Sequence, residues 1–270
     1  MSDLNHEELA IHVEGLRTQF GPVVVHDDLD LKVRKGEVLG VVGGSGTGKS
    51  VLLRTIIGLN KAAAGKITVL GQVAGEGGGE AERALRRRWG VLFQDGALFS
   101  SLTVRENIEA PMREHTELSN DLRCSAAELK IALSGLPPDA ADKYPSELSG
   151  GMRKRAGLAR SLALDPDILF LDEPTAGLDP IGAANFDLLI LELQRALGLT
   201  VVMITHDLDS LHAICERVAV LINKKTQIDT IPNLMKIDHP WIQEYFGGPR
   251  GRAAVASAER ANAVSVGVNE

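Results

Sequence analysis

VLGVVGGSGTGKSV, residues Val38–Val51, passes from an apolar run into glycines and then into a lysine and a serine. The apolar run predicts a buried strand, and the residues SVLLRTIIGL that follow predict a helix. The glycines between them lack a Cβ atom, so the loop can adopt strained dihedral angles and approach a bulky anion closely. The stretch therefore predicts a strand, a tight loop and a helix N-terminus.

This loop has the groups needed to bind the phosphates of a nucleoside triphosphate. Backbone N–H groups at a helix N-terminus, together with the helix dipole, favour an anion there. Lys49 supplies a positive charge for the terminal phosphates, and the Ser50 hydroxyl is a suitable ligand for Mg²⁺. The spacing Gly43-x4-Gly48-Lys49-Ser50 is that of a phosphate-binding loop. The alternative, an incidental glycine-rich turn, is disfavoured by the flanking strand and helix.

The bulk composition is that of an ordinary globular protein. Of 270 residues, 44% are hydrophobic and 24% are charged, and the net charge is −7, so we expect no general affinity for nucleic acid. Cys124 and Cys215 stand far apart without metal-ligand spacing, which is typical of thiols in a reducing cytosol. The N-terminal sequence is polar and acidic, and the apolar runs are too short to span a membrane. We expect any membrane role to require a partner.

The N-terminal half begins with a pattern of strands. Apolar and polar residues alternate from Ile11 to Val33, which predicts two or three antiparallel strands broken at Gly21-Pro22. Residues 75–82, GEGGGEAE, predict a flexible acidic loop, and a basic helix is expected to follow it and lead into a strand. The run Arg86–Arg88 is interpreted as a solvated helix face, and nucleic-acid binding is the disfavoured alternative.

The C-terminal half divides into an insertion, an α/β part and an extension. Helical patterns with polar faces predict an inserted subdomain of about residues 96–158. Strands then alternate with helices, which predicts a mainly parallel sheet covered on both faces. Residues of about 226–252 are expected to form a C-terminal extension, and residues 253–270 a disordered tail. The extension is expected to dock through Trp241, Ile242, Tyr245 and Phe246.

Two adjacent carboxylates follow a second apolar run. Ile168–Glu173, ILFLDE, predicts a central strand that ends in acids, at the edge where open α/β sheets bind ligands. Asp172 is placed to hold Mg²⁺ through water, opposite Ser50. Glu173 is placed to orient and deprotonate a water for attack on the γ-phosphate. Acids at strand ends are also common in loops, but the phosphate-binding loop favours the catalytic interpretation.

The segment Leu148–Met152, LSGGM, predicts a second anion site. Ser149 and two glycines open the predicted helix MRKRAGLARSLAL, so a hydroxyl and backbone N–H groups meet at a helix N-terminus. The alternative is a simple N-cap with a glycine turn. A second anion site in one chain is explained if it binds phosphate across a dimer.

These motifs resemble those of the ATP-binding-cassette (ABC) ATPases. Gly43–Ser50 resembles Walker A, Ile168–Glu173 resembles Walker B, and Leu148–Met152 resembles the LSGGQ signature. The resemblance implies an α/β P-loop NTPase (RecA-like) core with an antiparallel β subdomain and an inserted α-helical subdomain. It implies one ABC ATPase domain over residues 1–252.

Further matches extend the resemblance to the Q-loop, the D-loop, the switch histidine and the A-loop. In this family two domains sandwich two ATP molecules, each phosphate loop facing the partner's signature. The resemblance implies that Gln94 contributes to the Mg²⁺ site and senses the γ-phosphate, and that His206 bonds the γ-phosphate. Asp179, in Gly177-Leu178-Asp179, would help to place the partner's active site. Phe20 would stack on adenine, and a core phenylalanine is the alternative.

The expected site residues follow from these matches, with two departures. Met152 replaces the signature glutamine, so any contact of that amide is lost, and Gly44 replaces the usual proline, which should loosen the loop entrance without disabling it. The expected catalytic residues are Glu173, His206 and Gln94, and the expected Mg²⁺ ligands are Ser50, Gln94 and Asp172. The residues expected at ATP are Phe20, Gly43, Gly44, Ser45, Gly46, Thr47, Gly48, Lys49, Ser50, Val51, Ser149, Gly150, Gly151 and Asp179.

The finer resemblance is to the ATPases of lipid transporters that work with MCE proteins, the Mla type. It is carried by LFQDGALFSSLTVRENIEAPMREHT, LSGGMRKRAGLAR and HPWIQEYFGGPRG. It implies two copies of this subunit under two permease subunits, at the cytoplasmic face of a bacterial inner membrane. An MCE lipid-binding protein would lie outside, and a STAS-domain protein would bind the ATPase.

The expected function is therefore ATP hydrolysis that powers transport of phospholipid or a related hydrophobic substrate. One alternative is an importer ATPase for a small polar solute. The other is a soluble ABC ATPase acting on ribosomes or DNA, a class that usually has two cassettes or long coiled-coil insertions, neither of which is found here. Gly96–Ser101 is expected to form part of a groove for a permease helix, unless Leu98 and Phe99 simply fill the subdomain core.

Overall fold

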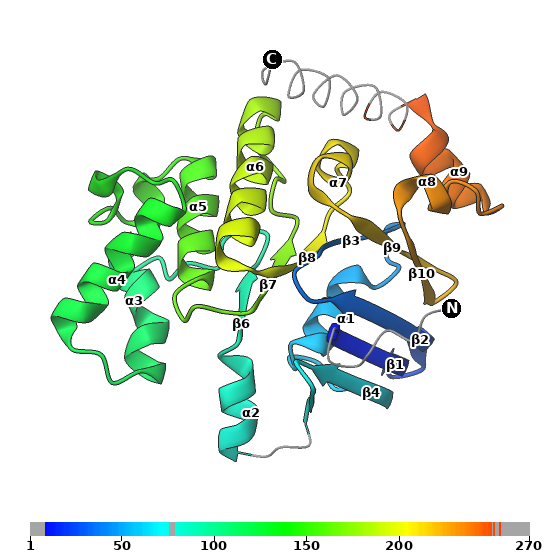
Figure 1. Cartoon of the computed structure of the whole chain (residues 1–270), viewed down its shortest axis with the longest axis horizontal. Helices are drawn as coiled ribbons and strands as arrows, with labels where there is room; N and C mark the ends of the chain where they lie inside the picture. Colours follow the sequence, from blue (N-terminus) through cyan, green and yellow to red (C-terminus); the bar gives the residue numbers. More distant parts are fainter. Residues whose placement is uncertain (1–8, 76–78, 250, 252–253, 255–270) are drawn as a thin grey trace.

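The computed structural model describes residues 9–75, 79–249, 251 and 254, which form two sheets and their flanking helices (Figure 1). One sheet has the strand order β2-β1-β4-β5, and the other has the order β10-β9-β3-β8-β7-β6. In the described residues, no helix combines the length and apolar character needed to cross a bilayer.

The first sheet is antiparallel, as predicted. It consists of β1 (Leu9–Phe20), β2 (Val23–Arg34), β4 (Ala64–Val69) and β5 (Gln72–Val73). The predicted break at Gly21-Pro22 is a tight turn, and Gly21 there has a positive φ of 56°. The inward side chains of β1 and β2 are fully buried, because one face of this sheet packs on the rest of the domain.

The second sheet supplies the edge at which the site is built. Its parallel strands are β3 (Val38–Gly43), β6 (Trp89–Leu92), β7 (Ile168–Asp172), β8 (Thr200–Ile204) and β9 (Arg217–Ile222). Every residue of β7 and β8 is buried, as expected of strands covered on both faces. Because these strands are parallel, the loops that follow them meet at one edge.

Helices cover both faces of the parallel sheet. Helix α1 (Lys49–Ile56) joins the cluster between the two sheets, where Leu52 and Ile56 are buried. On the other face, α6 (Pro180–Leu197) buries Phe186 and Ile190 against β7 and β8, and α7 (Leu208–Ile214) packs beside α6. Helix α6 ends at Gly198 in the left-handed conformation, which glycine adopts without steric cost.

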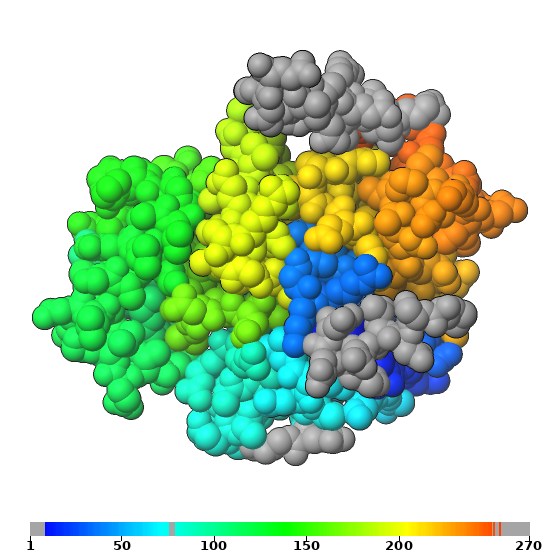
Figure 2. Space-filling view, in the orientation of Figure 1, coloured from blue at the N-terminus to red at the C-terminus, as the bar shows by residue number. Residues whose placement is uncertain are grey.

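A separate apolar cluster holds the inserted helices together. It joins α3 (Val104–His115), α4 (Asn120–Leu133) and α5 (Gly150–Ser161), with short 3₁₀ turns at Pro138–Ala140 and Pro145–Glu147. In the space-filling view these residues, coloured green, form one lobe beside the sheets (Figure 2). The lobe thus has an apolar core of its own, while Leu158 of α5 packs on the parallel sheet.

Two elements differ from the sequence prediction. Helix α2 (Gly79–Arg86) begins inside the predicted loop of residues 75–82, because Glu80 and Glu82 form ion pairs with arginines one turn later. Strand β10 (Lys225–Asp229) was not predicted, and it pairs antiparallel with β9. The turn between them has positive φ at Asn223 and Lys224, the geometry of a tight hairpin, but β10 itself is too polar to give a strand signal.

The C-terminal extension packs against the end of the parallel sheet. It contains α8 (Ile231–Leu234) and α9 (Pro240–Gly247). Ile242 and Phe246 are buried with residues of β3 and β9, and Trp241 stacks on Tyr245 with ring centroids 4.6 Å apart at the edge of this cluster. The four predicted docking residues therefore all face the domain. The predicted tail, residues 253–270, lies outside the described residues except for Ala254.

Candidate functional site

The loop between β3 and α1 is packed too closely for side chains at two of its glycines. Gly48 has φ +97°, and a Cβ there would lie 2.4 Å from Val25 Cγ1 and 2.6 Å from His26 Nε2. A Cβ at Gly43 would lie 2.8 Å from the Leu221 carbonyl oxygen. Gly48 caps α1 without a side-chain hydrogen bond from the described residues, so the first N–H groups of α1 are available for an anion.

The entrance of this loop contacts the C-terminal extension. A Cβ at Gly44, which stands in place of the usual proline, would lie 3.5 Å from Trp241 Nε1. The indole thus packs over the loop entrance, the part of the loop that Gly44 is expected to loosen. Helix α9 therefore supports a loop that has lost the stiffness of a proline.

Lys49 folds over the loop that precedes it. Its Nζ donates to the carbonyl oxygens of Gly43 at 2.8 Å and Gly44 at 3.1 Å. Burial lowers the pKa of Lys49, and the nearby charges of Glu173 and Asp172 oppose that change. The ammonium group is thus held between the loop and the carboxylates at the end of β7.

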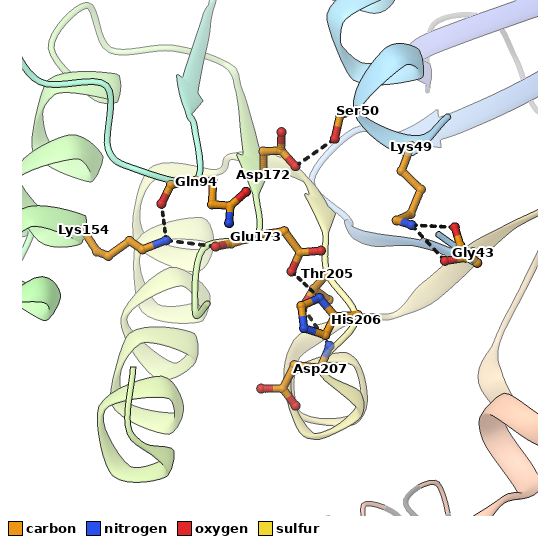
Figure 3. Close-up of polar contacts among 11 residues, drawn as sticks. Gly43, Lys49, Ser50, Gln94, Lys154, Asp172, Glu173, Thr205, His206 and Asp207 are labelled. Carbon is orange, nitrogen blue, oxygen red and sulfur yellow. Dashed lines mark hydrogen bonds and ion pairs between the residues drawn. The ribbon is translucent and has the colours of Figure 1, made fainter. Parts of the chain in front are cut away.

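Ser50 and Asp172 form the oxygen pair expected for Mg²⁺. Ser50 Oγ donates to Asp172 Oδ1 at 3.4 Å, and Asp172 is only 7% exposed at the end of β7. Burial, and then the charge of Glu173, raises the pKa of Asp172, so a divalent cation there would relieve an unfavourable charge. Hydroxyl, carboxylate and amide oxygens are the ligands that Mg²⁺ prefers. Figure 3 shows the Gln94 side chain directed toward Asp172 and Glu173.

Glu173 lies beside His206 in a pocket. Oε2 of Glu173 lies 2.8 Å from Nδ1 of His206, and Thr205 and Asp207 complete this part of the lining (Figure 3). Glu173 has φ 52°, which is uncommon for a residue other than glycine, and its N–H donates to the Ile204 carbonyl at 2.9 Å. The backbone therefore turns the carboxylate out of the sheet and into the pocket.

The signature and the D-loop line a second, adjoining cavity. Its lining includes Ser149, Gly150, Gly151 and Asp179, and Gly177 borders both cavities. Ser149 Oγ accepts from the Met152 N–H at 3.2 Å, which is the N-cap of the alternative interpretation. In Figure 1 the N-terminal regions of α5 and α1 lie apart, with β7 and β8 between them. The two predicted anion sites are thus not joined within one chain.

Other predicted residues are placed as follows. Met152 packs against the core of α3, α4 and α5, so the side chain that replaces the signature glutamine points into that subdomain. Phe20 is 53% exposed at the end of β1, so the core alternative is wrong for this residue. Leu98 packs on the subdomain core, as the alternative predicted for it, whereas Phe99 is half exposed and lies under the Arg160 guanidinium, 4.8 Å from the ring centroid.

Sequence reasoning missed one charged residue close to the site. Lys154 on α5 is buried, and its Nζ donates to the carbonyl oxygens of Gln94 and Glu173. The available signal was its helical position, because Gly157 and Leu158, three and four residues later, are buried on the same face. A lysine on the buried face of a helix requires polar partners.

Comparisons with known proteins identify the family. A model described as "ABC transporter" matches residues 26–176, and the probable ribonucleotide transport ATP-binding protein mkl of Mycobacterium tuberculosis is 38% identical over 90% of this chain and 67% of that protein. The chain belongs to the ABC transporter family. The fold and motifs of this family fit the site, and the chain is an ABC-type ATP hydrolase.

Further relatives of this ABC ATPase have different names. The intermembrane phospholipid transport system ATP-binding protein MlaF of Haemophilus influenzae is 39% identical over 80% of this chain and 81% of that protein. The methionine import ATP-binding protein MetN of Caulobacter vibrioides is 43% identical over 72% of this chain and 58% of that protein. The predicted resemblance to ABC ATPases, including the Mla type, is confirmed. The relatives are named for the transport of different substrates, namely ribonucleotide, phospholipid and methionine.

Solved structures confirm the predicted fold class. The dimeric structure of a bacterial ABC transporter cassette superposes with a TM-score of 0.74 at 27% identity, covering 82% of this chain and 98% of that one. A post-hydrolysis state of the same cassette, bound to ADP and phosphate, matches with the same values. The P-loop core, the antiparallel β subdomain and the inserted helices of this ABC ATPase are thus those of solved cassettes.

Proposed function

We propose that this ABC ATPase powers transport of phospholipid or a related hydrophobic substrate through a separate permease. The observation that carries the ATPase part is the convergence of Lys49, Ser50, Asp172 and Glu173 at one edge of the parallel sheet. The similarity to MlaF, over four fifths of both chains, supports the lipid substrate. The names of mkl and MetN favour the second candidate, an importer of a small polar solute.

Each side chain has a role in hydrolysis. When ATP binds, the Lys49 ammonium group leaves the carbonyl oxygens of Gly43 and Gly44 and donates to the terminal phosphates instead. Ser50, Gln94 and Asp172 would hold Mg²⁺, which when bound neutralises charge on the β- and γ-phosphates. Glu173 accepts the proton of the attacking water as general base.

His206 and the loop backbone complete the site. His206 holds the Glu173 carboxylate at 2.8 Å and is exposed enough to turn toward a γ-phosphate. The N–H groups of Ser45–Val51 surround the phosphates, and Phe20 offers its half-exposed ring to the adenine.

The separation of the two anion sites supports a homodimer. Ser149–Gly151 and Asp179 line a cavity that does not include Lys49 or Ser50. In an ATP sandwich, each phosphate loop faces the signature of the partner, and the similarity to a dimeric cassette supports this assembly. The test is a crosslink between Gly44→Cys and Ser149→Cys. It should join different subunits when ATP is bound, and a bond only within one chain would contradict the sandwich.

The proposed assembly includes a membrane permease. We assign residues 1–252 to the ATPase domain, and the subdomain assigned to residues 96–158 presents the half-exposed Phe99 close in sequence to Gln94. A permease helix seated against Phe99 would respond to changes at Gln94. We place two copies of this chain at the cytoplasmic face of a bacterial inner membrane, with an MCE protein outside and a STAS-domain protein on the ATPase.

The deciding experiment is purification of the intact complex from native membranes. The Glu173→Gln chain is used as bait, because slow hydrolysis should hold the assembly together, and co-purified proteins and lipids are identified by mass spectrometry. Permease with bound phospholipid supports the lipid function. Permease with a soluble solute-binding protein and without phospholipid would favour the importer. The wild-type chain, purified in parallel, controls for lipid that associates with any membrane preparation.

A further inference from the structure

Lys154 connects three segments that are distant in sequence. It lies on α5, and its Nζ donates to the carbonyl oxygen of Gln94 at 2.5 Å and to that of Glu173 at 3.0 Å. Gln94 follows β6, and Glu173 follows β7. Figure 3 shows the ammonium group between these two carbonyl oxygens, with a dashed line to each. One side chain thus joins the signature helix, the Q-loop and the main chain of the proposed general base.

The environment of Lys154 is unfavourable for a cation. The residue is 7% exposed, and within the described part of the chain it forms no ion pair. Burial lowers its pKa, and the charges of Asp95, Glu173 and Asp172 act in the opposite direction. Burying a charge whose hydrogen-bond partners are only carbonyl groups lowers the stability of the fold. We therefore expect the role of Lys154 to be the positioning of the groups that it binds.

We propose that Lys154 is a positioning residue that fixes the catalytic glutamate relative to the signature helix of the same chain. Glu173 has φ 52°, and its carbonyl orientation is held by Lys154 while its N–H is held by the Ile204 carbonyl. Helix α5 begins at Gly150, one turn before Lys154. A movement of the Gln94 or Glu173 main chain would therefore alter the Lys154 hydrogen bonds that hold α5 in place. The N-terminus of α5 is the part that faces the partner's ATP in the proposed dimer. This inference rests on the proposed roles of Glu173 and Ser149.

The test compares two buried lysines of the same helical subdomain. Lys154→Met removes both hydrogen bonds and keeps the packing volume. Lys130→Met is the matched control, because Lys130 is 5% exposed on α4 and pairs with Asp165, away from Gln94 and Glu173. Steady-state kcat and KM are measured with the full-length chain, and the Kd of ATP is measured separately by equilibrium binding.

Lys154→Met is expected to lower the turnover number while leaving the affinity for ATP nearly unchanged. Lys154→Met should lower kcat about 10–100-fold. This is the effect expected if the free energy of one charge-assisted hydrogen bond is lost from the stabilisation of the transition state. The Kd of ATP should change less than about 3-fold, because among the described residues Lys154 donates only to the main-chain carbonyls of Gln94 and Glu173 and to no residue of the loop Gly43–Ser50. ATP-dependent crosslinking between Gly44→Cys and Ser149→Cys should also fall. Lys130→Met should leave kcat and the crosslink unchanged, even if its melting temperature drops.

A second variant keeps the inference testable if Lys154→Met does not fold. Lys154→Gln retains an N–H donor and removes the charge, so it should fold and show an intermediate kcat. Wild-type kcat in either folded variant, or an equal loss of kcat in Lys130→Met, would overturn the inference. Glu173→Gln is assayed beside them. If it still hydrolyses ATP, the proposed role of Glu173 fails; if only Lys154 variants are unaffected, that role stands and this inference fails.

Discussion

His206 Nδ1 lies 2.8 Å from Glu173 Oε2, although the histidine side chain is 74% exposed and the glutamate side chain is 17% exposed. The pair joins the loop after β8 to the end of β7, so the loops of two neighbouring strands meet at the proposed general base. The imidazole therefore contacts the oxygen that a general base would use to accept a proton. Rotation of the exposed imidazole toward a γ-phosphate would free the carboxylate to accept a proton.

Replacing Glu173 with glutamine tests the general base. The amide keeps the shape of the side chain but cannot accept a proton, so phosphate release should fall about 10²–10⁴-fold. The affinity for ATP should remain, and an ATP-bound dimer should accumulate on size-exclusion chromatography. Turnover near the wild-type rate would show that another group is the base.

Replacing His206 with alanine should affect hydrolysis without affecting the fold. The His206 side chain is 74% exposed, and a contact made by so exposed a side chain contributes about 0–1 kcal/mol, so the melting temperature should change little. Loss of a transition-state contact to phosphate should lower kcat about 10²-fold. His115→Ala, on α3, is the control and should retain kcat. An unchanged kcat in His206→Ala would remove the histidine from the mechanism.

Two glycine substitutions separate steric fit from backbone strain in the phosphate-binding loop. Gly48→Ala adds a Cβ that would lie 2.4 Å from Val25 Cγ1, so we expect loss of ATP binding together with a lower melting temperature. Gly46→Ala adds a Cβ at φ +77°, and apart from the chain neighbours of Gly46 no atom of the described residues lies within 4 Å of it. Its cost should be limited to about 1–2 kcal/mol of left-handed strain. Equal effects of the two substitutions on the melting temperature would contradict the packing described for Gly48.

The sequence predicted those parts of the site that depend on local chemistry. The glycines before Lys49 specify a strand, a loop and a helix by local sequence alone. Two acids directly after an apolar strand likewise place carboxylates at the end of that strand. Parallel strands then bring Ser50 within 3.4 Å of Asp172, as the common edge of such a sheet requires.

The features that escaped prediction depend on tertiary contacts. Strand β10 is polar, and it forms because a tight turn brings it beside β9, with which it pairs antiparallel. Lys154 belongs to a run of basic residues, and only the position of α5 against Gln94 and Glu173 distinguishes it from its exposed neighbour Arg153. Leu98 and Phe99 are adjacent apolar residues, and their different burial is decided by the packing of the α3–α5 lobe.

A buried carboxyl group between α6 and α7 should make stability depend on pH. Asp187 is 4% exposed, and its Oδ2 accepts from Ser210 Oγ at 2.6 Å. Its Oδ1 has no hydrogen-bond partner among the described residues. Burial raises the pKa of Asp187 from 3.8 to about 6, and the charges of Asp207 and Asp209 add to that rise.

The folded state therefore binds the Asp187 proton more tightly than the unfolded state does. The stability from this group is fully present below pH 3.8, falls as the pH rises toward about 6, and is constant above that. Asp187→Asn removes the titration, so the free energy of unfolding of the variant minus that of the wild type should rise by about 1.4 kcal/mol between pH 5 and pH 8. Urea denaturation at several pH values measures it, with the exposed Asp121→Asn as the control. A difference that stays constant across this range would show that Asp187 remains ionised in the folded protein.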